Sequence, residues 1–213
     1  VGLVRAQRPV VTRVEVPIPD LPTAWEGQTI VQLSDVHLGH VHGRGFARRL
    51  ARRVEALDPA LVLITGDLFD GMASDFDRFV EPLSELDARH GVIFTTGNHE
   101  GYNQHLDPWA AIEQTPIRIL DHDLVEIDGL LIVGVAYPGL QGESGDAFIA
   151  AHGDRIAGPE PSVLLFHTPT DMGLQTDDLA EQQMATYWMP DVSCTTQREM
   201  GIDLQLAGHT HAG

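Results

Sequence analysis

The chain has 213 residues, of which 43% are hydrophobic and 21% are charged, enough to bury the core of one globular domain. Its 31 acidic side chains outnumber its 13 basic ones and give a formal net charge of −18, which argues against a broad basic surface for nucleic-acid binding. The single cysteine, Cys194, excludes an internal disulfide and a thiolate zinc cluster.

The first half of the chain alternates predicted strands with predicted helices. Residues 10–16 alternate in polarity like a strand, and a Pro-rich connector follows them. Short apolar runs predict three further strands, at 30–33, 61–65 and 92–95. Apolar residues at helical spacing predict helices after the first two of these strands, at about 46–57 and 76–86. Asp107-Pro108 suits the N-cap and first residue of a third helix, at about 108–114. Four arginines of the first helix are interpreted as a solvated face and not as a phosphate-binding patch.

The second half is expected to be more antiparallel. Residues 124–127 and 130–135 flank Asp128-Gly129, a strong signal for a two-residue hairpin turn. Two more strands are predicted at 163–166 and 202–207. Alternating strands and helices followed by hairpins indicate an α/β domain of two packed sheets flanked by helices.

Five of the predicted strands end in side chains that bind metal ions or phosphates. Ends of neighbouring strands converge on one rim of a sheet, so residues distant in sequence can meet there. Each cluster alone is a weak signal, because a Gly-Asp after a strand is more often a turn and a lone histidine more often satisfies a core hydrogen bond. Their coincidence at five strand ends favours one shared site. The clusters are Asp35-x-His37, Asp67 with Asp70, Asn98-His99, His167, and His209-x-His211.

The motifs DVH, GDLFD, GNHE, the isolated strand-end histidine and GHTH follow one another from residue 30 to the end of the chain. As a set, they resemble the calcineurin-like metallophosphoesterase family. The resemblance implies a four-layer sandwich of two mixed β-sheets flanked by helices. It also implies two divalent metal ions at the strand ends, and nitrogen and oxygen ligands without thiolate suit Mn, Fe, Zn or Co.

The resemblance further implies a role for each residue of the site. His99 would not be a ligand; it would face the substrate and donate to the leaving oxygen, with Asp70 as its orienting partner. The implied ligands of the first ion, those of the second ion and the bridging ligand are, in this order, Asp35, His37 and His211; Asn98, His167 and His209; and Asp67.

Charge arithmetic agrees with this assignment. Two divalent ions bring four positive charges, Asp35 and Asp67 return two negative ones, and a bridging hydroxide leaves the cluster about one charge positive. Such a cluster attracts phosphate despite the acidic surface, and metal ions lower the pKa of bound water toward ~7. We therefore expect hydrolysis of a phosphate mono- or diester, from a small molecule or a lipid, by the metal-bridging hydroxide. The alternatives are a non-catalytic interaction module of the same fold and an inactive fragment of the enzyme.

Two positions differ from known branches of the family and argue against a Ser/Thr protein phosphatase and against a tyrosinate-bound ferric site. Gly71 follows Asp70 where Ser/Thr protein phosphatases usually carry an arginine, and Phe69 stands where purple acid phosphatases place a tyrosine ligand. The opening VEVPIPDLP…IVQLSDVHLG and the ending GHTHAG resemble the membrane-associated bacterial branch of the family. We accordingly expect membrane association of the full-length protein, a removed anchor or signal before residues 1–29, and a soluble catalytic domain over 30–213. Only two residues follow His211, so the domain is expected to continue beyond residue 213.

The stretch between His167 and His209 is longer than expected for simple members of the family. It includes an acidic segment, 176–184, that is expected to be helical, and then the apolar residues Tyr187, Trp188 and Met189. These three side chains suit a lid that grips an apolar part of the substrate. They suit a plug at the edge of the core equally well.

Overall fold

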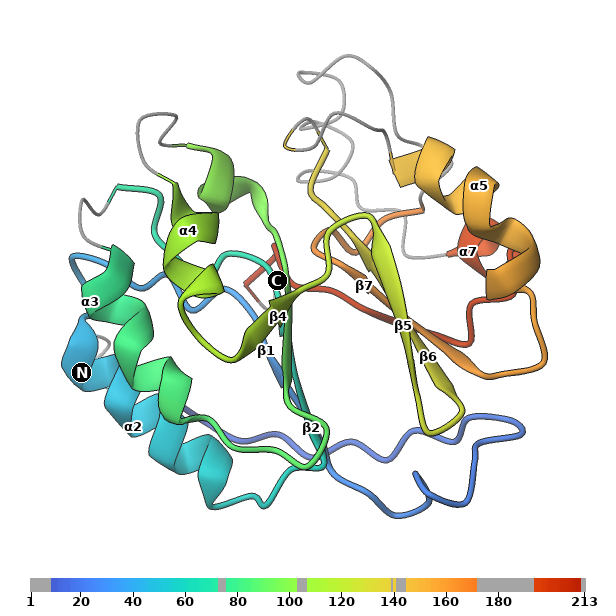
Figure 1. Ribbon diagram of the computed structural model, residues 1–213, viewed down its shortest axis with the longest axis horizontal. Coiled ribbons are helices and arrows are strands. Elements are labelled where there is room, and N and C mark those ends of the chain that lie inside the picture. The colour runs from blue at the N-terminus through green and yellow to red at the C-terminus, as the bar shows by residue number, and fades with distance from the viewer. Residues whose placement is uncertain are drawn as a thin grey trace.

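The computed structural model describes residues 9–72, 76–102, 107–138, 140, 145–171 and 194–211. These residues form two four-stranded sheets that face each other, and helices cover the outer face of each sheet (Figure 1). The layers therefore run helix, sheet, sheet, helix. This is the α/β sandwich that the sequence predicts.

The first sheet is parallel throughout. It contains β1 (Ile30–Leu33), β2 (Leu61–Thr65), β3 (Val92–Thr95) and β4 (Ile117–Ile119), in the order β1-β2-β3-β4. A mixed sheet was expected here, but a helical segment separates each strand from the next and returns the chain to the same end of the sheet. All four carboxyl ends consequently lie at one edge.

The helices α2 (Arg44–Glu55), α3 (Phe76–Val80) and α4 (Pro108–Glu113) lie on the outer side of the first sheet (Figure 1). In α2 the apolar stripe is buried and the four arginines are exposed, as predicted. The single helix expected over 76–86 is divided, because a 3₁₀ segment, η1 (Glu81–Glu85), replaces the α-helix after Val80. Pro82 explains the change, since its ring and missing N–H are incompatible with an α-helix interior.

The second sheet is mixed. It contains β5 (Asp123–Ile127), β6 (Leu130–Val135), β7 (Ser162–Phe166) and β8 (Leu204–Leu206), in the order β5-β6-β7-β8. Only the predicted hairpin β5–β6 is antiparallel, with positive φ at both turn residues; β6, β7 and β8 are parallel. The second half is therefore less antiparallel than expected, because α5 (Gly145–Ile156) and α7 (Thr195–Glu199) belong to crossover connections. The helix expected over 176–184 lies outside the described residues.

The two central strands of the first sheet, β2 and β3, are buried on both faces. In β2, Val62 and Ile64 join the apolar cluster beneath α2 and α3, whereas Leu61 and Leu63 join the cluster between the two sheets. Successive side chains of a strand point to opposite faces, so one apolar run supplies both layers of core. A further apolar cluster lies between the second sheet and α5.

The N-terminal segment departs from the prediction at its start. Residues 10–16 form no strand, and Val10 and Val14 are 88% and 75% exposed. Their polarity alternates, but no described strand lies beside them to supply the hydrogen bonds of a ladder. Further on, Trp25 is buried between the two sheets, and its indole N–H donates to the carbonyl oxygen of Ile127 over 3.0 Å. The connector thus packs onto the domain at the amino ends of the parallel strands.

Candidate metal centre

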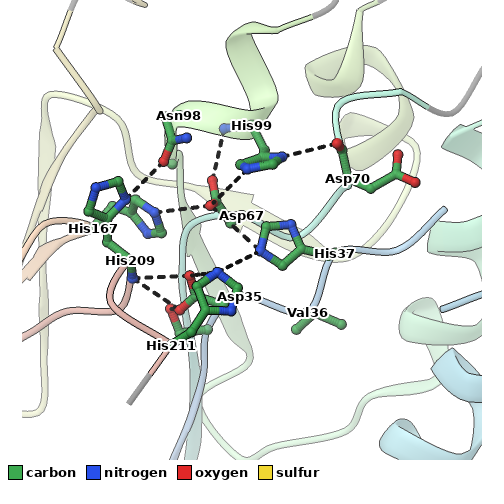
Figure 2. Close-up of polar contacts among 12 residues, drawn as sticks. Asp35, Val36, His37, Asp67, Asp70, Asn98, His99, His167, His209 and His211 are labelled. Atoms are coloured by element: carbon green, nitrogen blue, oxygen red, sulfur yellow. Dashed lines mark hydrogen bonds and ion pairs between the residues drawn. The ribbon is translucent and has the colours of Figure 1, made fainter. Parts of the chain in front are cut away.

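The seven expected ligands meet at the carboxyl ends of five strands, three from the first sheet and two from the second (Figure 2). The ends of parallel strands in both sheets point to the same edge of the sandwich. The side chains, in the order of strands β1, β2, β3, β7 and β8, are Asp35 and His37, Asp67, Asn98, His167, and His209 and His211.

Backbone strain is concentrated at these positions. A left-handed backbone costs a non-glycine residue roughly 1–2 kcal/mol, and such residues cluster at functional sites. Five of the ten described non-glycine residues with positive φ are expected ligands. They are Asp35 (φ 52), His37 (φ 49), Asp67 (φ 52), His209 (φ 71) and His211 (φ 51).

Two motif glycines allow the strand ends to approach one another. A Cβ at Gly66, where φ is +87, would overlap the imidazole of His167. A Cβ at Gly97 would overlap the carboxylate of Asp67. The glycines of GDLFD and GNHE are therefore required by close contact between separate strand ends.

Asp67 lies at the middle of the cluster and is 1% exposed. Its Oδ2 is 3.2 Å from His167 Nε2 and 3.8 Å from His37 Nε2. Its Oδ1 accepts a hydrogen bond from the backbone N–H of His99 over 2.8 Å. One carboxylate therefore faces imidazoles that come from different sheets.

On one side of Asp67, the side chains of Asp35, His37 and His211 offer atoms that lie within 4.8 Å of one another. His37 Nε2 is 3.2 Å from His211 Nε2, which in turn is 3.5 Å from Asp35 Oδ1. The two imidazole rings stack with centroids 5.0 Å apart. On the other side, His167 and His209 form a second such group with Asp67, and Asn98 Oδ1 lies 3.0 Å from His209 Nδ1.

The surroundings of His167 test whether a cation fits. The side chain is fully buried, and its Nδ1 donates to the carbonyl oxygen of Thr65 over 2.7 Å. Because a carbonyl only accepts, Nδ1 carries a proton in this contact, and in the neutral form of the ring the lone pair lies on Nε2. That atom is buried without a hydrogen-bond partner and faces the Asp67 carboxylate. Two electron-rich atoms directed at each other in a buried site suit a positive ion that both can bind.

The pKa values of His209, His37 and Asp67 favour the forms that bind a metal ion. Burial, reinforced by the neighbouring His167, lowers the pKa of His209 to about 4, and burial likewise lowers the pKa of His37. Both imidazoles are therefore neutral at neutral pH. Burial alone would raise the pKa of Asp67, but the adjacent His167 and His99 hold it below its usual value, so the carboxylate is ionised. For His167 the direction is opposite: burial alone would lower its pKa, but the adjacent Asp67 carboxylate raises it, so a positive charge is favoured between these two side chains.

His99 contacts Asp70, its expected orienting partner, through the backbone of Asp70. Its Nδ1 donates to the backbone carbonyl oxygen of Asp70 over 3.0 Å, and not to the Asp70 carboxylate (Figure 2). The carboxylate instead accepts the backbone N–H groups of His40 and Met72, each over 2.9 Å. An isolated bridge between Leu38 and Phe69 holds the loop after β2 beside the loop after β1.

Glu100 is a functional candidate that the sequence argument missed. It is 3% exposed, and its carboxylate accepts three backbone N–H groups, those of Asp67 (3.0 Å), Gly97 (2.7 Å) and Phe69 (3.1 Å). Burial, together with the charge of Asp67, raises the pKa of Glu100 to about 8. Its place in GNHE was a signal, but its hydrogen bonds to the loop after β2 could not be inferred from spacing. The expected lid or plug, Tyr187 to Met189, lies outside the described residues.

The family profile described as calcineurin-like phosphoesterase matches residues 28–213. The chain belongs to this family. Proteins named "Transmembrane protein with metallophosphoesterase domain" are 34% identical to it in Bos taurus and 33% identical in Danio rerio. Each match covers 100% of this chain and 47% of the relative, so the chain spans about half the length of these curated relatives.

Two further matches are a partial sequence match to an enzyme and a match to a solved structure. The UDP-2,3-diacylglucosamine pyrophosphatase LpxG of Chlamydia trachomatis is 31% identical over 91 residues, covering 42% of this chain and 28% of that protein. The solved structure of TT1561 of Thermus thermophilus matches with a TM-score of 0.56 and 14% identity, covering 84% of this chain and 80% of that one. The latter likeness supports the fold. Within the described ranges, no helix of this family member has the length and apolar character needed to cross a bilayer.

Proposed function

We propose that the chain hydrolyses a phosphate mono- or diester with two divalent metal ions held at the strand ends. One ion would be bound by Asp35, His37 and His211, and the other by Asn98, His167 and His209. The observation that carries the proposal is the position of Asp67, which faces His37 at 3.8 Å and His167 at 3.2 Å and so can serve both groups. When bound, the ions supply a nucleophile derived from water and stabilise the charge on the phosphoryl oxygens.

The ligand set controls the charge that the substrate meets. Four of the seven proposed ligands are imidazoles and one is the neutral amide of Asn98, so only Asp35 and Asp67 return negative charge to the ions. A third carboxylate in place of Asn98 would cancel much of the attraction for phosphate. This local positive charge allows a chain with a formal charge of −18 to take an anionic substrate.

His99 is the proposed general acid. Because its Nδ1–H donates to the Asp70 carbonyl, Nε2 is the nitrogen available to the substrate. Nε2 lies 3.9 Å from Asp67 Oδ2, and the side chain is 28% exposed, so a protonated Nε2 can reach a substrate beside the bridging carboxylate. Donation of this proton to the leaving oxygen typically contributes about 10²–10⁴-fold to the rate.

The experiment compares metal reconstitution with loss of the acid. Chelator-stripped protein is assayed on a chromogenic phosphomonoester and a phosphodiester after addition of Mn²⁺, Zn²⁺, Fe²⁺ or Co²⁺. Activity should return with at least one ion. His99→Ala should lower turnover about 10²–10⁴-fold while bound metal stays at the wild-type level. Full activity of stripped protein in excess chelator would contradict the metal mechanism, and metal loss in His99→Ala would contradict the role of His99.

Within this function, an amphiphilic substrate is the proposed class. Val41 and Met72 are 71% and 73% exposed and lie on the loops after β1 and β2. The Asp70 carboxylate holds both loops beside the centre through the backbone N–H groups of His40 and Met72. Such side chains suit the apolar part of a lipid phosphate ester, in line with the names of LpxG and of the transmembrane relatives.

A paired substitution tests the substrate class. The double variant Val41→Ser/Met72→Ser should lose severalfold more kcat/KM on a long-chain phosphate ester than on a short-chain ester with the same head group. Val14→Ser, which changes an exposed valine of the N-terminal segment, is the control. Equal effects on both esters would remove the lipid preference and leave the hydrolytic proposal intact.

A non-catalytic interaction module is less well supported. A module without chemistry has no need of the complete ligand set together with His99. The candidate metal groups at the described strand ends contain His99 and six of the seven proposed ligands, and Asn98 contacts His209 beside them; five of the ligands have a left-handed backbone.

A further inference from the structure

Tyr102 touches two residues of the proposed centre. It follows the short 3₁₀ segment η2 (Asn98–Gly101), and its backbone N–H donates to the carbonyl oxygen of His99 over 3.3 Å. Its hydroxyl accepts a hydrogen bond from Asn98 Nδ2 over 2.7 Å. Its ring lies against the His99 imidazole, with centroids 4.4 Å apart and planes tilted by 43°. Tyr102 lies two residues after the motif GNHE and is not part of it.

The hydrogen bond to Asn98 determines which end of the amide faces the centre. Only the amide oxygen has lone pairs for a cation, because the nitrogen carries donors alone. With Nδ2 directed at Tyr102, Oδ1 lies 3.0 Å from His209 Nδ1, among the proposed ligands of the second ion. Without an acceptor at Tyr102, the amide could turn and present its NH₂ group to the ion.

Tyr102 is held in place although its side chain is 57% exposed. Gly71 packs against it from the loop after β2, where an added Cβ would lie 3.0 Å from the Tyr102 Cβ. Gly71 also has φ +72, a conformation that favours glycine. The loops after β2 and β3 therefore meet at this tyrosine, beside His99.

We propose that Tyr102 is a positioning residue, whose hydroxyl holds Asn98 with its oxygen toward the second ion and whose ring holds His99. The inference rests on the proposed function. It predicts that binding of the second ion depends on Tyr102 and that binding of the first ion does not. In the described part of the chain, the ligands proposed for the first ion contact one another and form no hydrogen bond or ring contact with Tyr102.

The test separates hydroxyl from ring. Mn²⁺ is titrated into chelator-stripped protein by calorimetry, and bound metal is counted by elemental analysis. Tyr102→Phe should weaken one Mn²⁺ site about 10–100-fold and leave the other unchanged, and saturating Mn²⁺ should restore its kcat. Tyr102→Leu should show the same metal defect and, in addition, a lower kcat that excess Mn²⁺ does not restore.

Tyr137→Phe is the matched control. Tyr137 lies beside His209, with ring centroids 6.3 Å apart, but within the described ranges its hydroxyl makes no hydrogen bond to a proposed ligand. It should bind Mn²⁺ like the wild type. Unchanged Mn²⁺ affinity at both sites in Tyr102→Phe would overturn the inference while the proposed function stands. A wild-type chain that binds fewer than two ions would overturn the proposed function and this inference together.

Discussion

At the scale of single residues, the site depends on groups that hold backbone as much as on groups that face the substrate. Glu100 is the clearest case, since its buried carboxylate joins the loop after β2 to the loop after β3 through three N–H groups. Asp67 is both a proposed bridging ligand and one of these donors. The position of Asp67 therefore depends on an acid that never reaches the surface.

Glu100→Ala tests this dependence. The substitution leaves three buried N–H groups without their acceptor, and should lower the free energy of unfolding by roughly 3–5 kcal/mol. Denaturant unfolding of the metal-free protein measures the loss. Glu113→Ala, at an exposed position of α4, is the control and should change the value by no more than about 0.5 kcal/mol. Equal stability of the two variants would contradict the role given to Glu100.

The sequence predicted the grouping of the expected ligands because they are polar residues at the ends of apolar strands, a pattern visible without coordinates. The contributions of Glu100 and Tyr102 could not be read in this way, since each depends on contacts outside its own motif position. For Asp70 the motif indicated a partner of His99 but not the atom that makes the contact. A sequence displays side chains, whereas the contact with His99 uses the backbone carbonyl.

At the scale of elements, buried strands were predictable and short or glycine-containing elements were not. The apolar runs of β2 and β3 are long enough to be distinctive. In contrast, β4 has three residues, and α5 includes Gly145 and Gly153, which weaken a helical signal. Parallel pairing of β6 with β7 could not be inferred either, because it depends on a crossover that includes the unpredicted helix.

The predicted start of α4 permits a test at this scale. The Asp107 side chain accepts the backbone N–H of Ala110 over 3.0 Å and so caps the helix. Asp107→Ala should lower the free energy of unfolding by about 0.5–2 kcal/mol, because this N–H loses its acceptor. Asp107→Asn keeps a capping oxygen and should lose clearly less, as measured by thermal or denaturant unfolding. If Asp107→Asn lowered the free energy of unfolding as much as Asp107→Ala does, the charge of Asp107, and not its capping hydrogen bond, would stabilise this end of the helix.

At the scale of the whole molecule, opposite ends of the sandwich are joined in different ways. At the carboxyl ends of the parallel strands the sheets meet through the polar cluster, and at the amino ends they meet through apolar contacts that include Trp25. The residues before β1 thus belong to the same structural unit as the site. The alternating polarity of residues 10–16 could not predict this packing. It bears only on whether a strand forms there, whereas the contact with the domain is made by Trp25.

Trp25→Ala is the corresponding prediction. Removal of this buried ring should lower the free energy of unfolding by about 3–5 kcal/mol. The affinity for Mn²⁺ in the folded protein should stay near the wild-type value, because Trp25 lies at the far end of the strands from the proposed ligands. Trp25→Phe keeps much of the apolar volume and should lose less stability. A selective loss of metal binding in either variant would contradict the separation of the two ends.

The division of the expected ligands between the sheets has a consequence for the protein during translation. The strands of the first sheet emerge from the ribosome with Asp35, His37, Asp67 and Asn98, whereas the three remaining imidazoles arrive only with β7 and β8. Of the expected ligands, a nascent chain therefore carries the two aspartates, the asparagine and one histidine long before it can enclose a pair of ions. Under the proposed function, metal chemistry begins only after β8 has been synthesised and the two sheets have docked.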